Sequence, residues 1–150
     1  FIHVSEHSND DLRKIIMNYY YKENIEYIFF DTMKTVIADI GRNAEIVNES
    51  IGISIYDDEK DENANLICAK AADELLTISD ITASFVMAKM NDKICISGRS
   101  IGDINVQLIL EKLGGGGHIT LAGAQLEGFS LEDAKDELII RINEYLLESE

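Results

Sequence analysis

The spacing of apolar residues along the chain changes near residue 45. Before this point, residues 10–23 and 25–47 carry apolar side chains three and four positions apart, the period of an amphipathic helix that ends near 41–43. After it, residues 45–56 alternate and are rich in Ile and Val, which predicts one or two strands. The chain therefore divides into a helical lead-in and a part of mixed secondary structure.

The mixed part predicts strands and helices that follow one another, with a hairpin turn at Asn91-Asp92. The expected elements are a helix over 64–77, strands over 80–90 and 93–99, a helix over 105–113, a helical turn over 119–123, a strand over 124–129 and a last helix capped by Ser130. This order predicts an α/β fold, a mixed β-sheet flanked by helices, with the helical lead-in at its N-terminal side.

Composition sets limits on the class of ligand. The 150 residues, 46% hydrophobic and 27% charged, suit one soluble domain with a core. The net charge of −15 argues against a broad surface that follows a nucleic-acid backbone, but it allows a local pocket for a small anion. Cys68 and Cys95 are expected to be buried reduced thiols. The chain starts at Phe1 without Met, so we expect a segment of a longer protein.

A run of four glycines and a histidine, Gly114-Gly115-Gly116-Gly117-His118, interrupts the apolar pattern. Glycine loses more backbone freedom on folding than any other residue, so four in a row inside a folded region need a reason. We expect positive φ angles at several of them, or a ligand against the bare main chain. A flexible linker is the alternative, although such linkers have polar flanks and these flanks are apolar.

Side chains on both sides of this run suit an oxyanion. Arg99 offers a planar fork of donors, Ser97 and Ser100 offer hydroxyls, and Asn105 stands at the start of a helix. The glycine run would add backbone N–H groups, and a helical turn after His118 would add its dipole. The imidazole of His118 can donate to a phosphate or stack on a base. Each feature alone is weak, but together they predict a phosphate-bearing ligand.

The same segments resemble the C-terminal, DHH-associated domain of the DHH phosphoesterases. The residues that carry the resemblance are Ser97-Gly98-Arg99-Ser100, Asn105-Val106-Gln107, Leu113–His118 and Ala122-Gly123-Ala124-Gln125, with Ala69–Leu76 and Ile81–Val86 before them. The glycine–histidine motif is shared by the whole superfamily. The Asn-Val-Gln element and the fourth glycine make the chain most similar to the cyclic-di-AMP phosphodiesterase branch.

The resemblance implies a division of labour between two lobes. In this family an upstream lobe carries an Asp-His-His motif that binds two manganese ions, and the C-terminal lobe holds the phosphate and nucleoside of the substrate. Residues 1–44 would then be a helical connector or the end of the upstream lobe, and residues 45–150 the substrate-binding domain. The implied substrate-binding residues are Ser97, Arg99, Ser100, Asn105, Gly114, Gly115, Gly116, Gly117 and His118.

The histidines of this chain, His3, His7 and His118, form no Asp-His-His motif. We therefore expect no catalytic residue, no metal and no cofactor in this chain, with manganese in the upstream lobe of the full-length protein. The chain alone should not hydrolyse a substrate.

The partners implied are a cyclic dinucleotide, cyclic-di-AMP first, or a short oligonucleotide, together with the upstream DHH lobe of the same polypeptide. The resemblance implies a cytoplasmic domain without membrane contact, in a full-length protein that is anchored in the membrane. Two alternatives stay open. One is an accessory module that binds RNA or short oligonucleotides, and the other is a module that forms a homodimer through the helix at 104–113 or through Tyr19–Tyr21.

Overall fold

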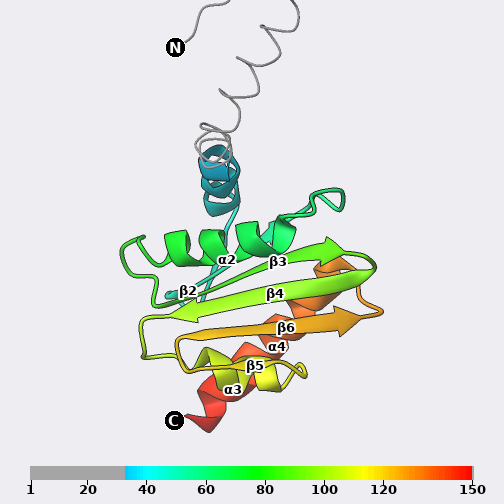
Figure 1. Ribbon diagram of the computed structural model, residues 1–150. Coiled ribbons are helices and arrows are strands. Elements are labelled where there is room, and N and C mark those ends of the chain that lie inside the picture. The colour runs from blue at the N-terminus through cyan, green and yellow to red at the C-terminus, as the bar shows by residue number, and fades with distance from the viewer. Residues whose placement is uncertain (1–32, 150) are drawn as a thin grey trace, which may run out of the picture. The chain divides into compact units, whose positions relative to one another are not determined.

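The computed structural model describes residues 33–149 of the chain. The chain divides into two compact units, Phe1–Thr35 and Val36–Glu150. The second unit contains a six-stranded mixed sheet with helices on both faces, so the predicted α/β fold is confirmed (Figure 1). Residues 33–42 are helical, as expected, whereas the helix expected over 10–23, the start of the next one and Tyr19–Tyr21 lie outside the described residues.

The strand order in the sheet is β1-β2-β3-β4-β6-β5. The elements are β1 (Glu45–Val47), β2 (Ile51–Tyr56), α2 (Ala64–Leu75), β3 (Ala83–Met90), β4 (Lys93–Ser100), α3 (Val106–Glu111), β5 (Gly116–Gly117), β6 (Leu121–Glu127) and α4 (Leu131–Glu148). Strands β2 and β3 are parallel, and α2 is the crossover that such a pair requires. The other neighbouring pairs are antiparallel.

The predicted hairpin at Asn91-Asp92 is confirmed. Met90 pairs with Lys93, so Asn91 and Asp92 form the complete turn between β3 and β4. Both have positive φ, 50° for Asn91 and 63° for Asp92, as a two-residue turn of matching twist requires. Asn and Asp tolerate this conformation better than other side chains, which explains their use here.

The central strands are buried on both faces, and alternate residues serve different layers. Phe85 and Met87 of β3 belong to a core that lies against α3 and α4. Ser84, the residue before Phe85, points to the other face, where its hydroxyl donates to the Ala72 carbonyl of α2 at 2.6 Å. The sheet is therefore covered by α2 on one face and by α3 and α4 on the other (Figure 1).

The helical turn expected over 119–123 is wrong. Strand β6 starts at Leu121, and its residues alternate between exposed and buried positions along the whole strand. The buried members, Ala122, Ala124 and Leu126, join the core. The small residues of this segment were compatible with a helix, but the period of two and the pairing with β4 decide for a strand.

Helix α2 covers β2, β3 and β4. On β6, the residues that point to the same face as α2 include Leu121 and Gln125, and both are exposed. The sheet thus continues beyond the helix. The edge of α2 therefore stands above the uncovered strand β6 and forms a step there. None of the described helices is long and apolar enough to cross a membrane.

The core under α4 generates a first prediction. Leu138 is fully buried against the sheet, whereas Leu147 on the same helix is 71% exposed. Leu138→Ala should lower the free energy of unfolding by about 2–5 kcal/mol, because it removes packed atoms and leaves a cavity. Leu147→Ala, the matched control, should change it by less than about 0.5 kcal/mol. Urea denaturation of both variants measures the difference, and equal losses would contradict this packing.

Candidate functional site

A pocket of about 520 Å³ lies where the sheet continues beyond α2. Its lining comes from four elements: the first turn of α2, β4, β6 and the glycine run. The residues are Asn65, Cys95, Ile96, Ser97, Gly114, Gly115, Gly123, Ala124 and Gln125. This volume lies in the range of small-molecule sites. We call it the glycine pocket.

Two glycines of the run are required by the fold. A Cβ atom at Gly115 would lie 2.2 Å from the Gly123 carbonyl oxygen, and one at Gly117 would lie 2.4 Å from the Leu121 carbonyl oxygen. Gly117 also has a φ of 148°, which side-chain-bearing residues rarely adopt. The bare backbone of β5 therefore lets it pack closely on β6.

Gly116 has a different environment from its two neighbours. A Cβ atom there would have nothing within 4 Å, and its φ is outside the left-handed region. The expectation of positive φ thus holds for Gly114, at 81°, and for Gly117, but not for Gly115 and Gly116. Packing does not explain why Gly116 lacks a side chain. It lies opposite Gly123 in the register, and Gly123 lines the pocket.

The backbone N–H groups of the run are partly used by the fold. Gly114 and Gly115 donate to the carbonyls of Glu111 and Leu110, at 3.0 and 2.8 Å, and end α3. His118 donates to the Leu121 carbonyl at 2.7 Å and closes the turn into β6. The expected series of free N–H groups is therefore interrupted, and no helix begins after His118.

The N–H of Gly117 lies at the open edge of the sheet, because the strand pairing gives it no partner on β6. His118 and Leu121 exchange two hydrogen bonds, and hydrogen-bonded pairs alternate with non-bonded pairs along an antiparallel ladder. The next pair, Gly117 with Ala122, is therefore a non-bonded pair. The Gly117 N–H points away from β6.

Arg99 lies on the same face of β4 as Ser97, because residues two apart along a strand share a face. Its Nε donates to the Asp73 carboxylate of α2 at 3.1 Å, and its Nη1 donates to the Gly98 carbonyl at 2.9 Å. The Arg99 side chain is 13% exposed and the Asp73 side chain 56% exposed. The guanidinium is thus held at the open edge of α2, further along β4 than the glycine pocket.

Ser97 lines the glycine pocket and is paired with Gly123 across β4 and β6. Among the described residues, none forms a hydrogen bond with the Ser97 hydroxyl. Gly116, Gly123 and Ser97 follow one another across three strands and form a row of small residues. Because two of the three are glycines, a ligand can approach the backbone along this row.

Ser100 is the last residue of β4 and Asn105 follows the next loop, and the polar groups of both are hydrogen-bonded within the fold. The Ser100 hydroxyl donates to the Ile104 carbonyl at 2.7 Å and accepts from the Gly102 N–H at 3.2 Å. The Asn105 side chain accepts from the Leu108 N–H at 3.1 Å and caps α3. The structure thus brings Ser97 and the glycine run together, with Arg99 next to them. The Ser100 hydroxyl instead holds the loop after β4, and the Asn105 side chain caps α3.

Three residues at this site were not singled out from the sequence: Asp73, Asn65 and Gln125. Asp73 and Gln125 stand within the segments that carry the family resemblance, but their types and spacing indicate no function. Asn65 is an ordinary exposed position at the start of α2. The packing of α2 along β4 places Asp73 and Asn65 at the site, and the pairing of β6 with β4 places Gln125 there.

Both cysteines are buried and unpaired, as the composition suggested. Burial, the largest cause, together with the nearby Cys95 and Asp61 raises the pKa of the Cys68 thiol to about 12. Burial also raises the pKa of the Cys95 thiol, and Lys93 opposes this change. Although Cys95 lines the glycine pocket, both thiols are held in the unreactive, protonated form.

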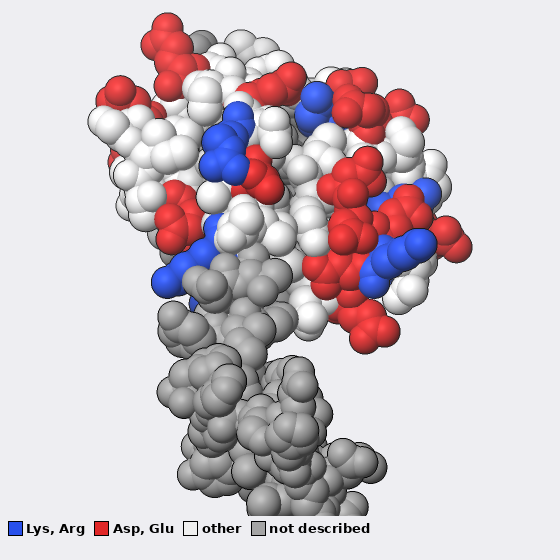
Figure 2. Space-filling view, turned by 90° about the horizontal axis from the view of Figure 1, so that it is seen from above, with Lys and Arg blue, Asp and Glu red and all other residues white. Residues whose placement is uncertain are grey.

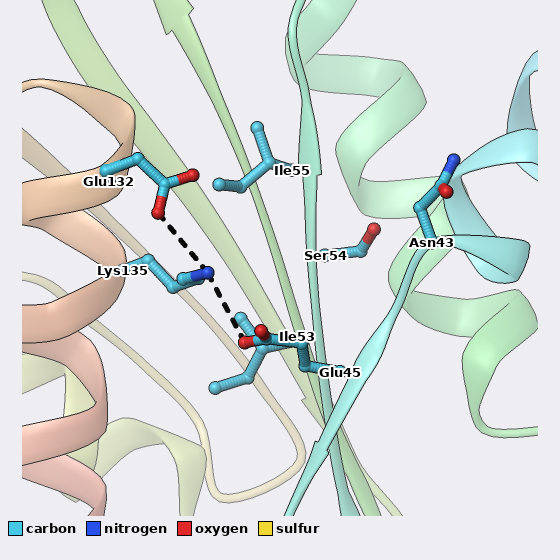
Figure 3. A pocket seen from close by; sticks show the side chains of 7 residues that line it. All are labelled: Asn43, Glu45, Ile53, Ser54, Ile55, Glu132 and Lys135. Atoms are coloured by element: carbon cyan, nitrogen blue, oxygen red, sulfur yellow. Dashed lines mark ion pairs between the residues drawn. The ribbon is translucent and has the colours of Figure 1, made fainter.

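A second, smaller pocket of about 220 Å³ lies between β1, β2 and α4. Figure 3 shows Lys135 reaching between Glu132 of its own helix and Glu45 of β1, with both ion pairs at 3.3 Å. Ser54 donates its hydroxyl to the Ile40 carbonyl at 2.7 Å. The lysine is neutralised by two carboxylates, so this pocket suits an anion less well than the glycine pocket and the adjoining Arg99 side chain, which together we call the groove beside Arg99.

Charge on the surface is unevenly distributed. In the view from above, Asp and Glu side chains gather in a dense cluster on one side, and the Lys and Arg side chains lie singly among other residues (Figure 2). On this face, the described part of the chain presents no continuous basic strip. A polymer that binds through many phosphate contacts would need one.

The fold and the site define a class of protein. The chain belongs to the DHHA1 domain family, whose model matches residues 43–148. The resemblance to the DHH-associated domain is therefore confirmed.

Named relatives point to one branch of that class. The chain is 39% identical over 119 residues to the cyclic-di-AMP phosphodiesterase GdpP of Geobacillus thermodenitrificans, covering 75% of this chain and 18% of that protein. It is 38% identical over 133 residues to the cyclic-di-AMP phosphodiesterase PdeA of Listeria monocytogenes, covering 87% of this chain and 19% of that protein. The chain thus spans less than a fifth of the length of these curated relatives. The expected similarity to the cyclic-di-AMP phosphodiesterase branch is confirmed.

A solved structure shows the same fold. The pGpG-specific phosphodiesterase PggH from Vibrio cholerae superimposes with a TM-score of 0.56 at 17% identity, over 83% of this chain and 42% of that one. At this identity, the likeness concerns the arrangement of helices and strands.

The glycine run generates a second prediction. Gly117→Ala should destabilise the domain by about 1–3 kcal/mol from backbone strain alone, and the contact with Leu121 adds to this loss. Gly116→Ala adds the same methyl group to the same strand in open space, so it should change stability by less than about 0.5 kcal/mol. Thermal and urea unfolding measure both. Similar values for the two variants would contradict the packing of β5 on β6.

Proposed function

We propose that this chain is the substrate-binding lobe of a DHH-family phosphodiesterase. It binds the phosphate and nucleoside of a cyclic dinucleotide, cyclic-di-AMP first, for hydrolysis by an upstream DHH lobe. The identity to GdpP and PdeA, both named as cyclic-di-AMP phosphodiesterases, supports the substrate class. The observation that carries the proposal is that Arg99, Ser97 and the open Gly116 share one face of the sheet, at and beside the glycine pocket.

The groups on this face suit the two parts of a nucleotide. Arg99 supplies a fixed positive charge and free donors for phosphate oxygens. The Gly117 N–H at the sheet edge and the His118 imidazole are further donors near the same end of β6. The glycine pocket, next to Arg99 along β4, has the size for a nucleoside, with Asn65 and Gln125 on its wall.

Manganese would belong to the upstream lobe. Among the described residues, no group of three or more His, Cys, Asp and Glu side chains is arranged to hold a metal ion. These residues do not fit a metal centre, so no catalytic step is assigned to them. The role proposed for this lobe is to bind and orient the phosphate.

Titration tests the binding role directly. Adding cyclic-di-AMP, or its linear dinucleotide product, should shift the amide signals of residues 114–118 in ¹H–¹⁵N NMR spectra. Unchanged signals at millimolar ligand would contradict the proposal. A 20-mer RNA should bind less well than the dinucleotide. Tight RNA binding that weakens steeply with salt would favour the oligonucleotide module instead.

Arg99→Ala should weaken dinucleotide binding by about 10- to 100-fold, the range for one charged hydrogen bond. The matched control is Arg141→Ala, because Arg141 lies on α4, against the opposite face of the sheet, and pairs with Glu137 and Glu144. Its affinity should equal that of the wild type. An equal effect of the two substitutions would indicate a general loss of positive charge instead of a site at Arg99.

Gly116→Val tests whether the ligand approaches the bare backbone. The added side chain has open space in the free protein. It should therefore leave the melting temperature nearly unchanged and still weaken dinucleotide binding. Unchanged affinity in a folded Gly116→Val variant would place the ligand away from β5.

A further inference from the structure

The Asp73–Arg99 ion pair is built from two elements that are distant in the sequence. Asp73 lies on α2 and Arg99 on β4, and Asp73 Oδ1 accepts from Arg99 Nε at 3.1 Å. Because the Arg99 side chain is mostly buried and that of Asp73 mostly exposed, the pair lies at the boundary between the helix and the groove. An ion pair whose carboxylate is open to solvent adds little to stability, so folding alone gives a weak reason for it.

The geometry of the pair fixes the guanidinium without using all its donors. Asp73 holds Nε, and the Gly98 carbonyl holds Nη1 at 2.9 Å. A guanidinium has five N–H donors in a rigid plane. Both bonds together fix the orientation of this plane, and the remaining donors on Nη1 and Nη2 are left for a ligand.

We propose that Asp73 is a positioning residue, which orients the Arg99 guanidinium toward the phosphate of the bound dinucleotide. This inference rests on the proposed function, because it needs Arg99 to bind phosphate. Its physical basis is preorganisation: a long side chain that is already ordered loses less conformational freedom when the ligand binds. Asp73 itself touches no ligand in this account.

The proposal and simple electrostatics predict opposite changes in phosphate affinity when Asp73 is removed. Asp73 is a negative charge near an anion site, so Coulomb's law alone says that its removal strengthens phosphate binding. If orientation dominates, Asp73→Ala instead weakens binding of the linear dinucleotide, by about two- to tenfold, the range for ordering one long side chain. Asp73→Asn keeps an oxygen that can accept from Nε and removes the charge. It should bind as tightly as the wild type or more tightly.

The experiment compares dissociation constants of these variants by NMR titration with the linear dinucleotide. Glu74→Ala is the matched control, since it removes the same charge from the next residue of α2, whose side chain is exposed and forms no ion pair within residues 33–149. Its affinity should stay at or slightly above the wild-type value. Asp73→Ser, whose side chain is shorter, is a second variant that should behave like Asp73→Ala.

The NMR signal of the Arg99 Nε–H reports directly on the orientation of the guanidinium. A purely structural role of Asp73 would not produce the following pattern. The signal should be sharp in the wild type and in Asp73→Asn, and it should broaden or move in Asp73→Ala. Wild-type or tighter binding by both Asp73→Ala and Asp73→Ser, while Arg99→Ala loses binding, would overturn the positioning role and leave the proposed function intact. Wild-type binding by Arg99→Ala would overturn both.

Discussion

The close contact between the backbones of β5 and β6 is the constraint on which the site depends. A side chain at Gly115 or Gly117 would meet a carbonyl oxygen of β6, so only a bare strand can lie there. This strand extends the sheet beyond the region that α2 covers. The step between the helix and the added strand is the glycine pocket. The same contact that shapes this edge of the sheet therefore also shapes the pocket that lies next to Arg99.

Much of the fold could be predicted because local signals agree with the tertiary structure. The alternation over 45–56, the Asn91-Asp92 turn and the Ser130 cap, whose hydroxyl accepts from the Asp133 N–H at 3.1 Å, each depend on neighbouring residues only. The error at 119–123 has the opposite cause. Ala122 locally favours a helix and Gly123 favours neither element, so the pairing with β4 decides their conformation.

The site was predictable in its residue types but not in its geometry. Arg99 and Ser97 could be singled out as candidates because charged and hydroxyl groups near a glycine run suggest an anion. The reason for the glycines was found only in part, since contact with β6 explains Gly115 and Gly117 and leaves Gly116 open. The partner of Arg99 could not be found, because Asp73 meets it only through the packing of α2 on β4. In a chain with a net charge of −15, such pairing decides which cations remain able to bind an anion.

The central claim is that the groove between α2 and the glycine strand binds a phosphate-bearing dinucleotide. A crystal structure of this chain with the linear dinucleotide bound tests it most directly. We expect a phosphate oxygen within hydrogen-bonding distance of the Arg99 guanidinium, with the nucleotide lying over Gly116 and Ser97. A dinucleotide bound elsewhere, such as in the pocket at Lys135, with the groove beside Arg99 empty, would contradict it.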